Sequence, residues 1–391
     1  MKASIRGVEV AGERVLVRED LNVPIKGGQI QDETRIRAAL STLKEVAGRG
    51  GRVVVTSHLG RPEGKPDPEL SLRPVAERLA QLLDPRRVLF ATDCVGSPAE
   101  EVVAELQDGD LAVLENVRFH PEEEANDPDF ARRLAALGDI FVNDAFGSSH
   151  RAHASVVGVA RHLPAYAGDL MIAELEALRV ALDDPRRPLV AIVGGAKVST
   201  KAGVLRYLLP RVDALIVCGA MANTFFKARG VDMGASLVED GALDDARAVE
   251  REAGSKLVLP VDGVVVRRVE ARQESRTVPM DGVEPGWIVV DIGPRTAELF
   301  GERVGEAGTV VWNGPPGMFE TEDFRAGTRA LAEAIAGSAA YSLVGGGDTA
   351  AAVEALGMAD RFSHVSTGGG ATLEYMEGKE LPGVAVLKEA S

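Results

Sequence analysis

The sequence contains little cysteine and no long apolar run. Its two cysteines, Cys94 and Cys218, lie far apart, and neither belongs to a Cys-x-x-Cys pair. Such usage argues against a disulfide framework or a structural zinc site, and it fits a reducing compartment. No stretch of about 18 apolar residues, the length that a membrane span requires, occurs anywhere in the chain. We therefore expect a cytoplasmic protein with neither a signal peptide nor a membrane span.

The chain is also short of positive charge. Lysine and arginine number 44 against 59 for aspartate and glutamate, which gives a formal net charge of −15. This balance gives no support to binding of nucleic acid or of an anionic membrane. The length of 391 residues is enough for two or three domains of ordinary size, each with its own core.

Several catalytic and nucleotide-binding fingerprints are missing. Neither Gly-x-x-x-x-Gly-Lys-Ser/Thr nor a well-placed Gly-x-Gly-x-x-Gly occurs. A P-loop enzyme and an NAD-dependent dehydrogenase are therefore disfavoured, and a nucleotide site in this chain must use another design. We also find no convincing Ser/His/Asp or Cys/His arrangement for nucleophilic catalysis.

Apolar, β-branched runs alternate with helical segments along the whole chain. This alternation predicts parallel βαβ units, and the similar style of the two halves predicts two α/β domains. The runs in the first half are RVLVR, RVVVTS, RVLFA, LAVLE and DIFVNDAF, and those in the second are PLVAIVGGAK, ALIVCGAM, KLVLPVD, TVVWNGPPG, YSLVGGGD and HVSTGGGA.

The segment 169–184 separates the two halves. Its apolar residues recur near helical spacing until PRRP breaks the pattern. We interpret it as an interdomain helix, and the alternative is a surface helix of the first domain.

Basic residues follow several predicted strands of the first half. Ligands of parallel α/β sheets bind beyond the carboxyl ends of the strands, so these side chains are expected to converge on one crevice. Arginine suits an anionic ligand because its planar fork gives phosphate or carboxylate two hydrogen bonds. Any one arginine taken alone is better explained as a solvated surface cation, and it is the number of basic groups at successive strand ends that favours a site. The candidates are His58, Arg61, Arg118 and Arg151, together with Arg35 at the start of a predicted helix.

Asp20 and Asn22 lie in VREDLNVP, directly after the first predicted strand. They share a parity, with Arg18 beside them, so in an extended segment their side chains point the same way. They either position a ligand hydroxyl or form an Asx turn before Pro24. His150 and His153 have a spacing that a metal site could use, but no further ligand set accompanies them.

Glycine-rich turns follow four predicted strands of the second half: GGAKVSTK, WNGPPGMFE, GGGDT and STGGGAT. Glycine lets backbone amides approach a phosphate, and the following helix offers free N–H groups. Purely structural turns of this kind are equally common. Lys197 and Lys201, four residues apart, are expected on one face of the first helical turn, within reach of phosphates. Asp348 is a candidate Mg²⁺ ligand.

Long motifs in fixed order resemble the phosphoglycerate kinase family nearly end to end. They include VREDLNVP, TRIRAAL, SHLGRP, ENVRFHPEEEANDP, VNDAFGSSHRAHAS, GGAKVSTK, DIGPRT, WNGPPGMFE, GGGDTAAAV and STGGGATLEYMEGKELPGV. The resemblance implies an α/β fold of two Rossmann-like domains with parallel sheets, joined by an interdomain helix around a central cleft. The implied parts are an acid-binding domain (1–168), the helix (169–184), a nucleotide-binding domain (185–372) and a C-terminal segment that packs back on the first domain (373–391).

The resemblance also implies a function, namely reversible Mg²⁺-dependent phosphoryl transfer in glycolysis. It would run between 1,3-bisphosphoglycerate and ADP, giving 3-phosphoglycerate and ATP, in a monomer that closes by hinge bending. Both nucleophiles, a carboxylate or a phosphate, are already ionised at neutral pH, so no general base is needed. A nucleotide-binding regulatory protein that has lost catalysis is the alternative.

The resemblance assigns each functional position of the family to a matching residue of this sequence. The implied binding residues for the acid substrate are Asp20, Asn22, Arg35, His58, Arg61, Arg118 and Arg151. The implied nucleotide residues are Lys201, Gly293, Glu320, Gly346, Gly347, Asp348 and Thr349, with Asp348 also at the magnesium. Arg35, Lys197, Gly346 and Gly369 are expected to neutralise charge on the transferring phosphoryl group.

Three residues depart from the family pattern. The family usually has a small or apolar residue at Glu19, phenylalanine at Leu21 and valine at Met318. Glu19 has the opposite parity from Asp20, so we expect it to face away from the pocket.

Overall fold

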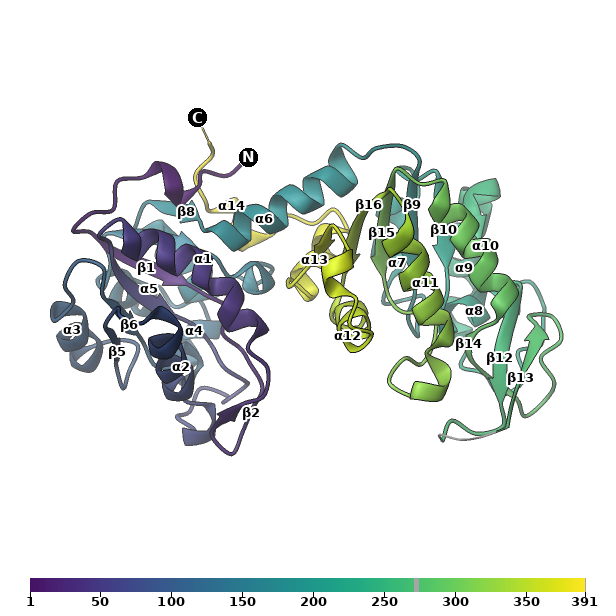
Figure 1. Cartoon of the computed structure of the whole chain (residues 1–391), viewed down its shortest axis with the longest axis horizontal. Helices are drawn as coiled ribbons and strands as arrows, with labels where there is room; N and C mark the ends of the chain where they lie inside the picture. Colours follow the sequence, from purple (N-terminus) through teal and green to yellow (C-terminus); the bar gives the residue numbers. More distant parts are fainter. Residues whose placement is uncertain (271–273, 391) are drawn as a thin grey trace. The chain divides into compact units, whose positions relative to one another are not determined.

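The computed structural model describes residues 1–270 and 274–390. By its contacts the chain forms two compact units: Met1–Leu175 with Glu380–Ser391, called the first unit, and Glu176–Lys379, called the second unit. In Figure 1 the first unit is mainly purple to blue, with the yellow C-terminal segment, and the second runs from teal through green to yellow. The two chain ends lie side by side in the first unit, where Lys2 and Glu389 form an antiparallel bridge.

The first unit contains one six-stranded parallel sheet, with the order β5-β6-β4-β1-β7-β8. The strands β1, β4, β6 and β7 are almost wholly buried, as expected of apolar runs covered on both faces. Their bounds are β1 (Arg14–Arg18), β4 (Arg52–Thr56), β5 (Val88–Phe90), β6 (Leu111–Val113), β7 (Ile140–Asn143) and β8 (Ala165–Ala167). A short hairpin, β2 (Ile25–Lys26) and β3 (Gln29–Ile30), stands apart from the sheet.

Helices of the first unit follow the strand ends. Val15 and Val17 of β1 share a core with Leu43 and Val46 of α1, so the strand and the first helix position each other. The helices are α1 (Thr34–Gly48), α2 (Arg73–Leu83), α3 (Ser97–Ala104), α4 (Pro121–Glu124), α5 (Pro128–Ala135) and α14 (Pro382–Ala385), with the 3₁₀ turns η3 (Val117–Phe119) and η4 (Phe146–Ser148).

The second unit repeats the design. Its parallel sheet has the order β11-β10-β9-β15-β16-β17, and Ile192, Trp312 and Val344 form part of the core on one face. The strands are β9 (Leu189–Val193), β10 (Ala214–Val217), β11 (Leu257–Val258), β15 (Thr309–Asn313), β16 (Tyr341–Gly345) and β17 (His364–Val365). The helices are α7 (Ala202–Leu208), α8 (Ala220–Ala228), α9 (Leu243–Ala253), α10 (Pro294–Gly305), α11 (Ala326–Gly337), α12 (Gly347–Ala355) and α13 (Gly370–Tyr375).

The predicted fold class, α/β with two parallel sheets, is confirmed. The sequence patterns did not predict the second unit's additional antiparallel sheet, with the order β13-β12-β14. Its strands are β12 (Asp262–Val266), β13 (Ser275–Pro279) and β14 (Ile288–Ile292). β13 is mostly exposed and lacks an apolar run, whereas β12 and β14 contain short apolar runs that the sequence analysis did not single out.

The segment predicted as a helix over 169–184 is α6 (Asp169–Leu178), extended by a π-helical turn at Arg179–Asp183. The boundary between the two units falls inside α6, between Leu175 and Glu176. None of the helices in the described ranges combines the length and the apolar character that crossing a membrane requires.

Candidate functional site

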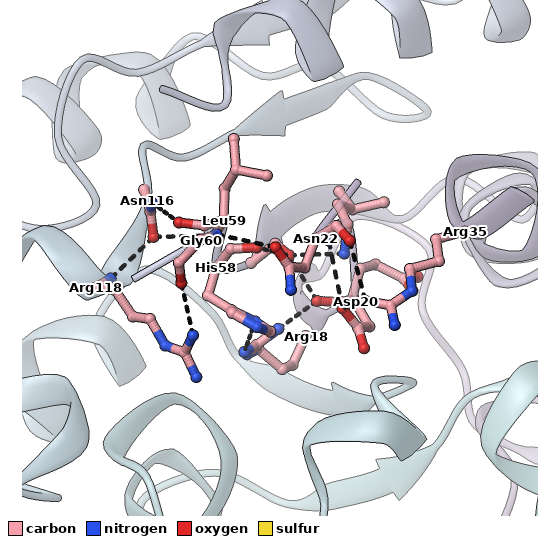
Figure 2. A network of polar contacts seen from close by, with 12 residues as sticks. Arg18, Asp20, Asn22, Arg35, His58, Leu59, Gly60, Asn116 and Arg118 are labelled. Carbon is pink, nitrogen blue, oxygen red and sulfur yellow. Dashed lines mark hydrogen bonds and ion pairs between the residues drawn. The ribbon is translucent and has the colours of Figure 1, made fainter. Parts of the chain in front are cut away.

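The basic side chains predicted at the strand ends of the first unit gather around His58, which follows β4. Burial and the positive charges of Arg18, Arg118, Arg35 and Arg151 together hold the pKa of His58 well below its usual value. Figure 2 shows several of these side chains in one network. Arg61 lies three residues after His58 and is exposed, and no contact within the described ranges joins it to the others.

Arg35 lies in the first turn of α1, as the sequence predicted. Its Nη1 donates hydrogen bonds to Oδ1 of Asp20 and to the carbonyl oxygen of Asn22, both at 3.0 Å (Figure 2). The backbone N–H of Asn22 donates to the same Oδ1 of Asp20 at 3.3 Å, which is an Asx-turn contact. The sequence analysis treated an Asx turn and a ligand site as alternatives. The Asp20–Asn22 segment forms the turn and also contacts the basic cluster through Arg35.

The loop after β4 is held from two sides at Gly60. The N–H of Gly60 donates to Oδ1 of Asn22 at 2.9 Å, and Nη1 of Arg118 donates to the Gly60 carbonyl oxygen at 2.7 Å. Gly60 has φ +61°, which favours glycine, and a Cβ there would lie 2.6 Å from the end of the Leu70 side chain. Asn22 and Arg118 therefore shape the loop that carries His58.

Asn116, which precedes η3, is fully buried and uses all of its side-chain hydrogen-bonding groups. Its Oδ1 accepts from the N–H groups of Leu59 (3.2 Å) and Arg118 (3.1 Å). Its Nδ2 donates to the carbonyl oxygens of Leu59 (2.7 Å) and Leu70 (3.0 Å). Asn116 thus connects the His58 loop to the turn that carries Arg118 (Figure 2).

Arg18, the last residue of β1, is buried with only 1% of its surface exposed. Its Nε donates to Oγ of Ser155 at 2.9 Å, and its Nη2 lies 3.0 Å from Nδ1 of His58. Ser155 in turn donates through Oγ to Glu123 Oε1 at 2.6 Å and through its N–H to Oε2 at 2.8 Å. The buried cation Arg18 and the buried anion Glu123 are therefore linked through one hydroxyl group.

Glu19, one of the family departures, is fully buried. Within the described ranges its two carboxylate oxygens have no hydrogen-bond partner. Burial raises its pKa well above the usual value, and the charge of Asp144 raises it further, while Arg18 lowers it. Asp144 is itself buried, and burial raises its pKa to about 6. Glu19 is thus a buried acid for which the neutral form is favoured.

Arg151 follows η4, and its Nε donates to Nε2 of His150 at 3.1 Å. Nδ1 of His153 lies 3.8 Å from Oε1 of Glu123, and burial together with Arg118, Arg18 and Arg151 lowers the pKa of His153 to about 4. The two histidines suggested by spacing are therefore neighbours of the arginine cluster.

One group of three potential metal ligands, Asp93, Cys94 and His120, occurs in the part of the chain that the structure describes. Oδ1 of Asp93 lies 2.8 Å from Nε2 of His120, which is a hydrogen-bond distance. Cys94 is buried, and burial raises the pKa of its thiol well above the usual value. Asp93 thus forms hydrogen bonds with both His120 and the backbone N–H of Cys94.

The second unit contains a cavity of about 450 Å³ whose lining includes two of the predicted nucleotide residues, Glu320 and Asp348, and parts of the GGAKVSTK and WNGPPGMFE loops. Apolar side chains such as Ile288, Val290 and Met318 form part of the wall, and the carboxylates of Glu320 and Asp348 reach the same cavity. A mainly apolar wall with a few polar groups is typical of a small-molecule site.

Lys201 is held by a residue that the sequence reasoning did not single out. Its Nζ donates to Oδ1 of Asn313 at 2.5 Å, and Nδ2 of Asn313 donates to the Gly345 carbonyl oxygen at 2.9 Å. Burial lowers the pKa of Lys201, while the charge of Asp348 raises it. Lys201, Asn313 and the glycine turn before Asp348 therefore form one cluster.

Lys197 does not lie in a helical turn, which corrects the expectation from spacing. Helix α7 begins at Ala202, and Lys201 is its N-cap residue. Lys197 is exposed in the preceding loop, where its positive charge helps to lower the pKa of Glu239. The N–H of Ser199 donates to Oε2 of Glu239 at 3.0 Å and ties this loop down.

The predicted glycines stand at helix starts. Gly293, Gly346 and Gly369 are the N-cap residues of α10, α12 and α13, and Gly347 is the first residue of α12. Gly346 has φ +90°, and a Cβ there would lie 2.8 Å from Nδ2 of Asn313. Thr349 is buried and accepts from the Gly314 N–H at 2.7 Å, so it supports the turn.

Sequence reasoning missed the roles of Arg18, Asn116, Glu123 and Asn313. Each stands in a motif that was recognised, VREDLNVP, ENVRFHPEEEANDP or WNGPPGMFE. For Arg18, Asn116 and Asn313 the available signal was a polar residue at or just after the end of an apolar run, where the sheet edge places it in or beside the site. Glu123 lies in α4, well beyond the strand, and carried no such signal.

Comparison with known proteins identifies the family. A sequence model described as "Phosphoglycerate kinase" matches residues 5–379. The phosphoglycerate kinase of Rubrobacter xylanophilus is 54% identical over 389 residues, covering 99% of this chain and 98% of the relative. That of Pelotomaculum thermopropionicum is 52% identical over 389 residues, covering 99% of each.

Solved structures agree with the sequences. Phosphoglycerate kinase from Coxiella burnetii superposes with a TM-score of 0.90 at 44% identity, covering 99% of this chain and 98% of the other. The enzyme from Pyrococcus horikoshii gives 0.86 at 32% identity, covering 98% of each. With both sheets, both halves and the ordered motifs matched, the chain belongs to the phosphoglycerate kinase family.

Proposed function

We propose that this protein catalyses reversible phosphoryl transfer between 1,3-bisphosphoglycerate and ADP, giving 3-phosphoglycerate and ATP. The observation that carries the proposal is the convergence of Arg35, Arg118 and Arg151 on His58, in a chain whose formal net charge is −15. Such a cluster in an acidic protein suits a small ligand with several negative charges. Family membership supplies the identity of that ligand.

In this proposal residues 1–168 bind the acid substrate. Arg35, Arg61, Arg118 and Arg151 give its phosphate and carboxylate charged donors. Asp20 and Asn22 orient the hydroxyl group, and His58 adds a further hydrogen bond. The contacts of Arg35 with the Asp20 segment support this division, because they fix the guanidinium while leaving the rest of its fork available.

Residues 185–372 bind the nucleotide in the cavity of the second unit. The apolar wall near Met318 receives the base, and Glu320 takes part at the nucleoside. Gly293, the N-cap residue of α10, takes part there as well. Lys201, Gly346, Gly347 and Thr349 hold the phosphates through the ammonium group and the start of α12. The position of Lys201 beside Asn313 and Asp348 supports a role at the phosphates.

The residues present fit a magnesium ion at Asp348. This carboxylate is exposed, borders the cavity and interacts with the charge of Lys201. Mg²⁺ in nucleotide sites needs only one or two carboxylates, with phosphate oxygens and water completing its shell. When bound, the ion would supply charge neutralisation at the nucleotide phosphates, and Asp348 would hold it.

No residue is needed as a general base, because both nucleophiles are ionised at neutral pH. Catalysis then consists of aligning two mutually repelling anions and stabilising charge on the transferring phosphoryl oxygens. We assign that stabilisation to Arg35, Lys197 and the backbone N–H groups at Gly346 and Gly369. Since the acid and the nucleotide bind to different units, we propose that the units close on each other during turnover and exclude water.

The test is a coupled assay that supplies ATP, Mg²⁺ and 3-phosphoglycerate and measures ADP formation. Turnover that requires all three supports the proposal. ATP binding by calorimetry without any turnover would contradict it, and would indicate a nucleotide-binding protein that has lost catalysis.

A further inference from the structure

Arg18 is a buried arginine for which the proposed mechanism has no use. It is 1% exposed, so it cannot serve as a surface cation, whereas the side chain of Arg35 is 37% exposed. Its guanidinium is divided among three acceptors: Oγ of Ser155, the carbonyl oxygen of Glu19 and Nδ1 of His58. The contact with His58, at 3.0 Å, is the one that reaches a proposed substrate residue (Figure 2).

The chemistry of that contact fixes the direction of the hydrogen bond. A guanidinium carries five N–H donors and no acceptor, and it stays charged in proteins. Nδ1 of His58 must therefore be the acceptor, with its lone pair toward Arg18. The single ring proton of the neutral imidazole is then on Nε2. A doubly protonated ring would direct an N–H group at a buried cation.

The surroundings of His58 agree with a neutral ring. The charged groups that act on it come from four places in the first unit: Arg18 in β1, Arg35 in α1, Arg118 in η3 and Arg151 after η4. All four are positive. Burial and these charges keep the pKa of the ring well below its usual value. Within the described ranges no protein acceptor is bonded to Nε2.

Glu123 explains how the cation can be buried there. Its carboxylate is fully buried and accepts both Oγ–H and N–H of Ser155, so the Ser155 oxygen presents its lone pair to Nε of Arg18. The row Glu123, Ser155, Arg18, His58 is a chain of buried hydrogen bonds that ends at the site. Such a chain defines the orientation of each member.

We propose that Arg18 is a positioning residue that locks His58 in the neutral Nε2–H tautomer, so that Nε2 is a permanent uncharged donor to an anionic oxygen of the substrate. The opposite tautomer would present a lone pair to that anion and repel it. The identity of the substrate rests on the proposed function, but the tautomer does not. Arg18 therefore influences substrate binding without touching the substrate.

The test is long-range ¹H–¹⁵N nuclear magnetic resonance on the full chain with ¹⁵N-labelled histidine and no ligand. The chain has six histidines, and the His58→Asn variant identifies the signals of His58. We expect protonated Nε2 and unprotonated Nδ1, unchanged between pH 6 and pH 8. Protonation of Nδ1, alone or together with Nε2, in the unaltered protein overturns the proposal. This readout is independent of kinase activity, so it separates failure here from failure of the proposed function.

Variants of Arg18 then test whether this residue causes the preference for the Nε2–H tautomer of His58. Arg18→Met removes the donor, and we expect exchange between the two tautomers and a KM for 3-phosphoglycerate raised about tenfold, with the nucleotide KM unchanged. Arg18→Lys retains a charged donor and is expected to keep the Nε2–H form. Arg14→Met is the control, because Arg14 stands at the other end of β1 and pairs with Asp139. A His58 that remains wholly in the Nε2–H form in Arg18→Met refutes the assignment.

Arg18→Met leaves Glu123 buried without its cation and can fail to fold. The double variant Arg18→Met/Glu123→Gln removes both charges and keeps the test available. The same mixture of tautomers is expected in it, and a pure Nε2–H form would again refute the proposal.

Discussion

Nη1 of Arg35 lies 3.0 Å from Oδ1 of Asp20 and donates as well to the carbonyl oxygen of Asn22. One guanidinium nitrogen thus ties the first turn of α1 to the segment after β1. In the described ranges the remaining nitrogens of this side chain have no protein acceptor, so Nε and Nη2 are available to a ligand. Substitution of Arg35 is therefore the most direct test of the proposed acid site.

Arg35→Ala is expected to lower kcat about 10²-fold or more, because it removes a charged donor that acts on the transferring group. Arg35→Lys should restore little of the lost kcat, since an ammonium group cannot make the two parallel hydrogen bonds of a planar guanidinium. The coupled assay measures both. Arg37→Ala is the matched control: Arg37 lies two residues along α1, is exposed and pairs with Glu33. Nearly normal turnover of Arg35→Ala would remove Arg35 from the mechanism.

Asp348→Ala tests the magnesium assignment. With the only carboxylate proposed for the ion removed, the Mg²⁺ concentration for half-maximal rate should rise about tenfold or more. Titration of Mg²⁺ at fixed ATP and 3-phosphoglycerate measures it. Asp360→Ala, which alters an exposed carboxylate just beyond α12, should behave like the unaltered protein. An unchanged Mg²⁺ dependence in Asp348→Ala would show that other groups hold the ion.

Glu19→Gln should stabilise the protein at alkaline pH. Because the folded state raises the pKa of Glu19, folding binds its proton more tightly than the unfolded chain does, and stability falls as pH rises above the unfolded pKa of about 4.3. A glutamine side chain does not ionise, so the variant does not lose stability in this way as the pH rises. The gain in free energy of unfolding should be about 1–3 kcal/mol at pH 8 and should shrink toward pH 4.

Urea unfolding at several pH values measures the effect of Glu19→Gln. Glu13→Gln provides the control, since Glu13 is exposed just before β1. A gain that does not vary with pH would show that Glu19 is not neutralised on folding.

Asn116→Ala should weaken the acid site through the loop that carries His58. It deletes four hydrogen bonds, three of them buried and one partly buried, at a cost of about 2–4 kcal/mol of unfolding free energy. The KM for 3-phosphoglycerate should rise while the nucleotide KM stays the same. Steady-state kinetics and urea unfolding measure the two effects. An equal rise in both KM values would indicate general loosening instead.

Asn313→Ala should give the opposite pattern. Without Oδ1 of Asn313 the ammonium of Lys201 loses its fixed position, so the nucleotide KM should rise about tenfold. The KM for 3-phosphoglycerate should not change, because the proposed acid site belongs to the other unit. Asn313→Ala and Asn116→Ala therefore serve as controls for each other, and a shared kinetic pattern would contradict the separation of the two sites.

The sequence by itself determined the parallel α/β class and the position of most strands. Apolar runs such as RVVVTS and PLVAIVGGAK must be buried on both faces, and few other arrangements allow that. It also indicated the strand ends at which polar residues gather, including Asp20, His58 and Asp348. The antiparallel strand β13 escaped recognition because its side chains are mostly exposed and carry no apolar signal.

Only the tertiary structure decided how the candidate residues act together. Spacing placed Lys197 and Lys201 on one helical turn, but α7 begins after both, because its start depends on contacts of the preceding loop. Parity grouped Arg18 with Asp20 and Asn22, but Arg18 is buried on Ser155 and His58. Residues distant in sequence supply these hydrogen bonds and this burial, and a local pattern contains no information about them.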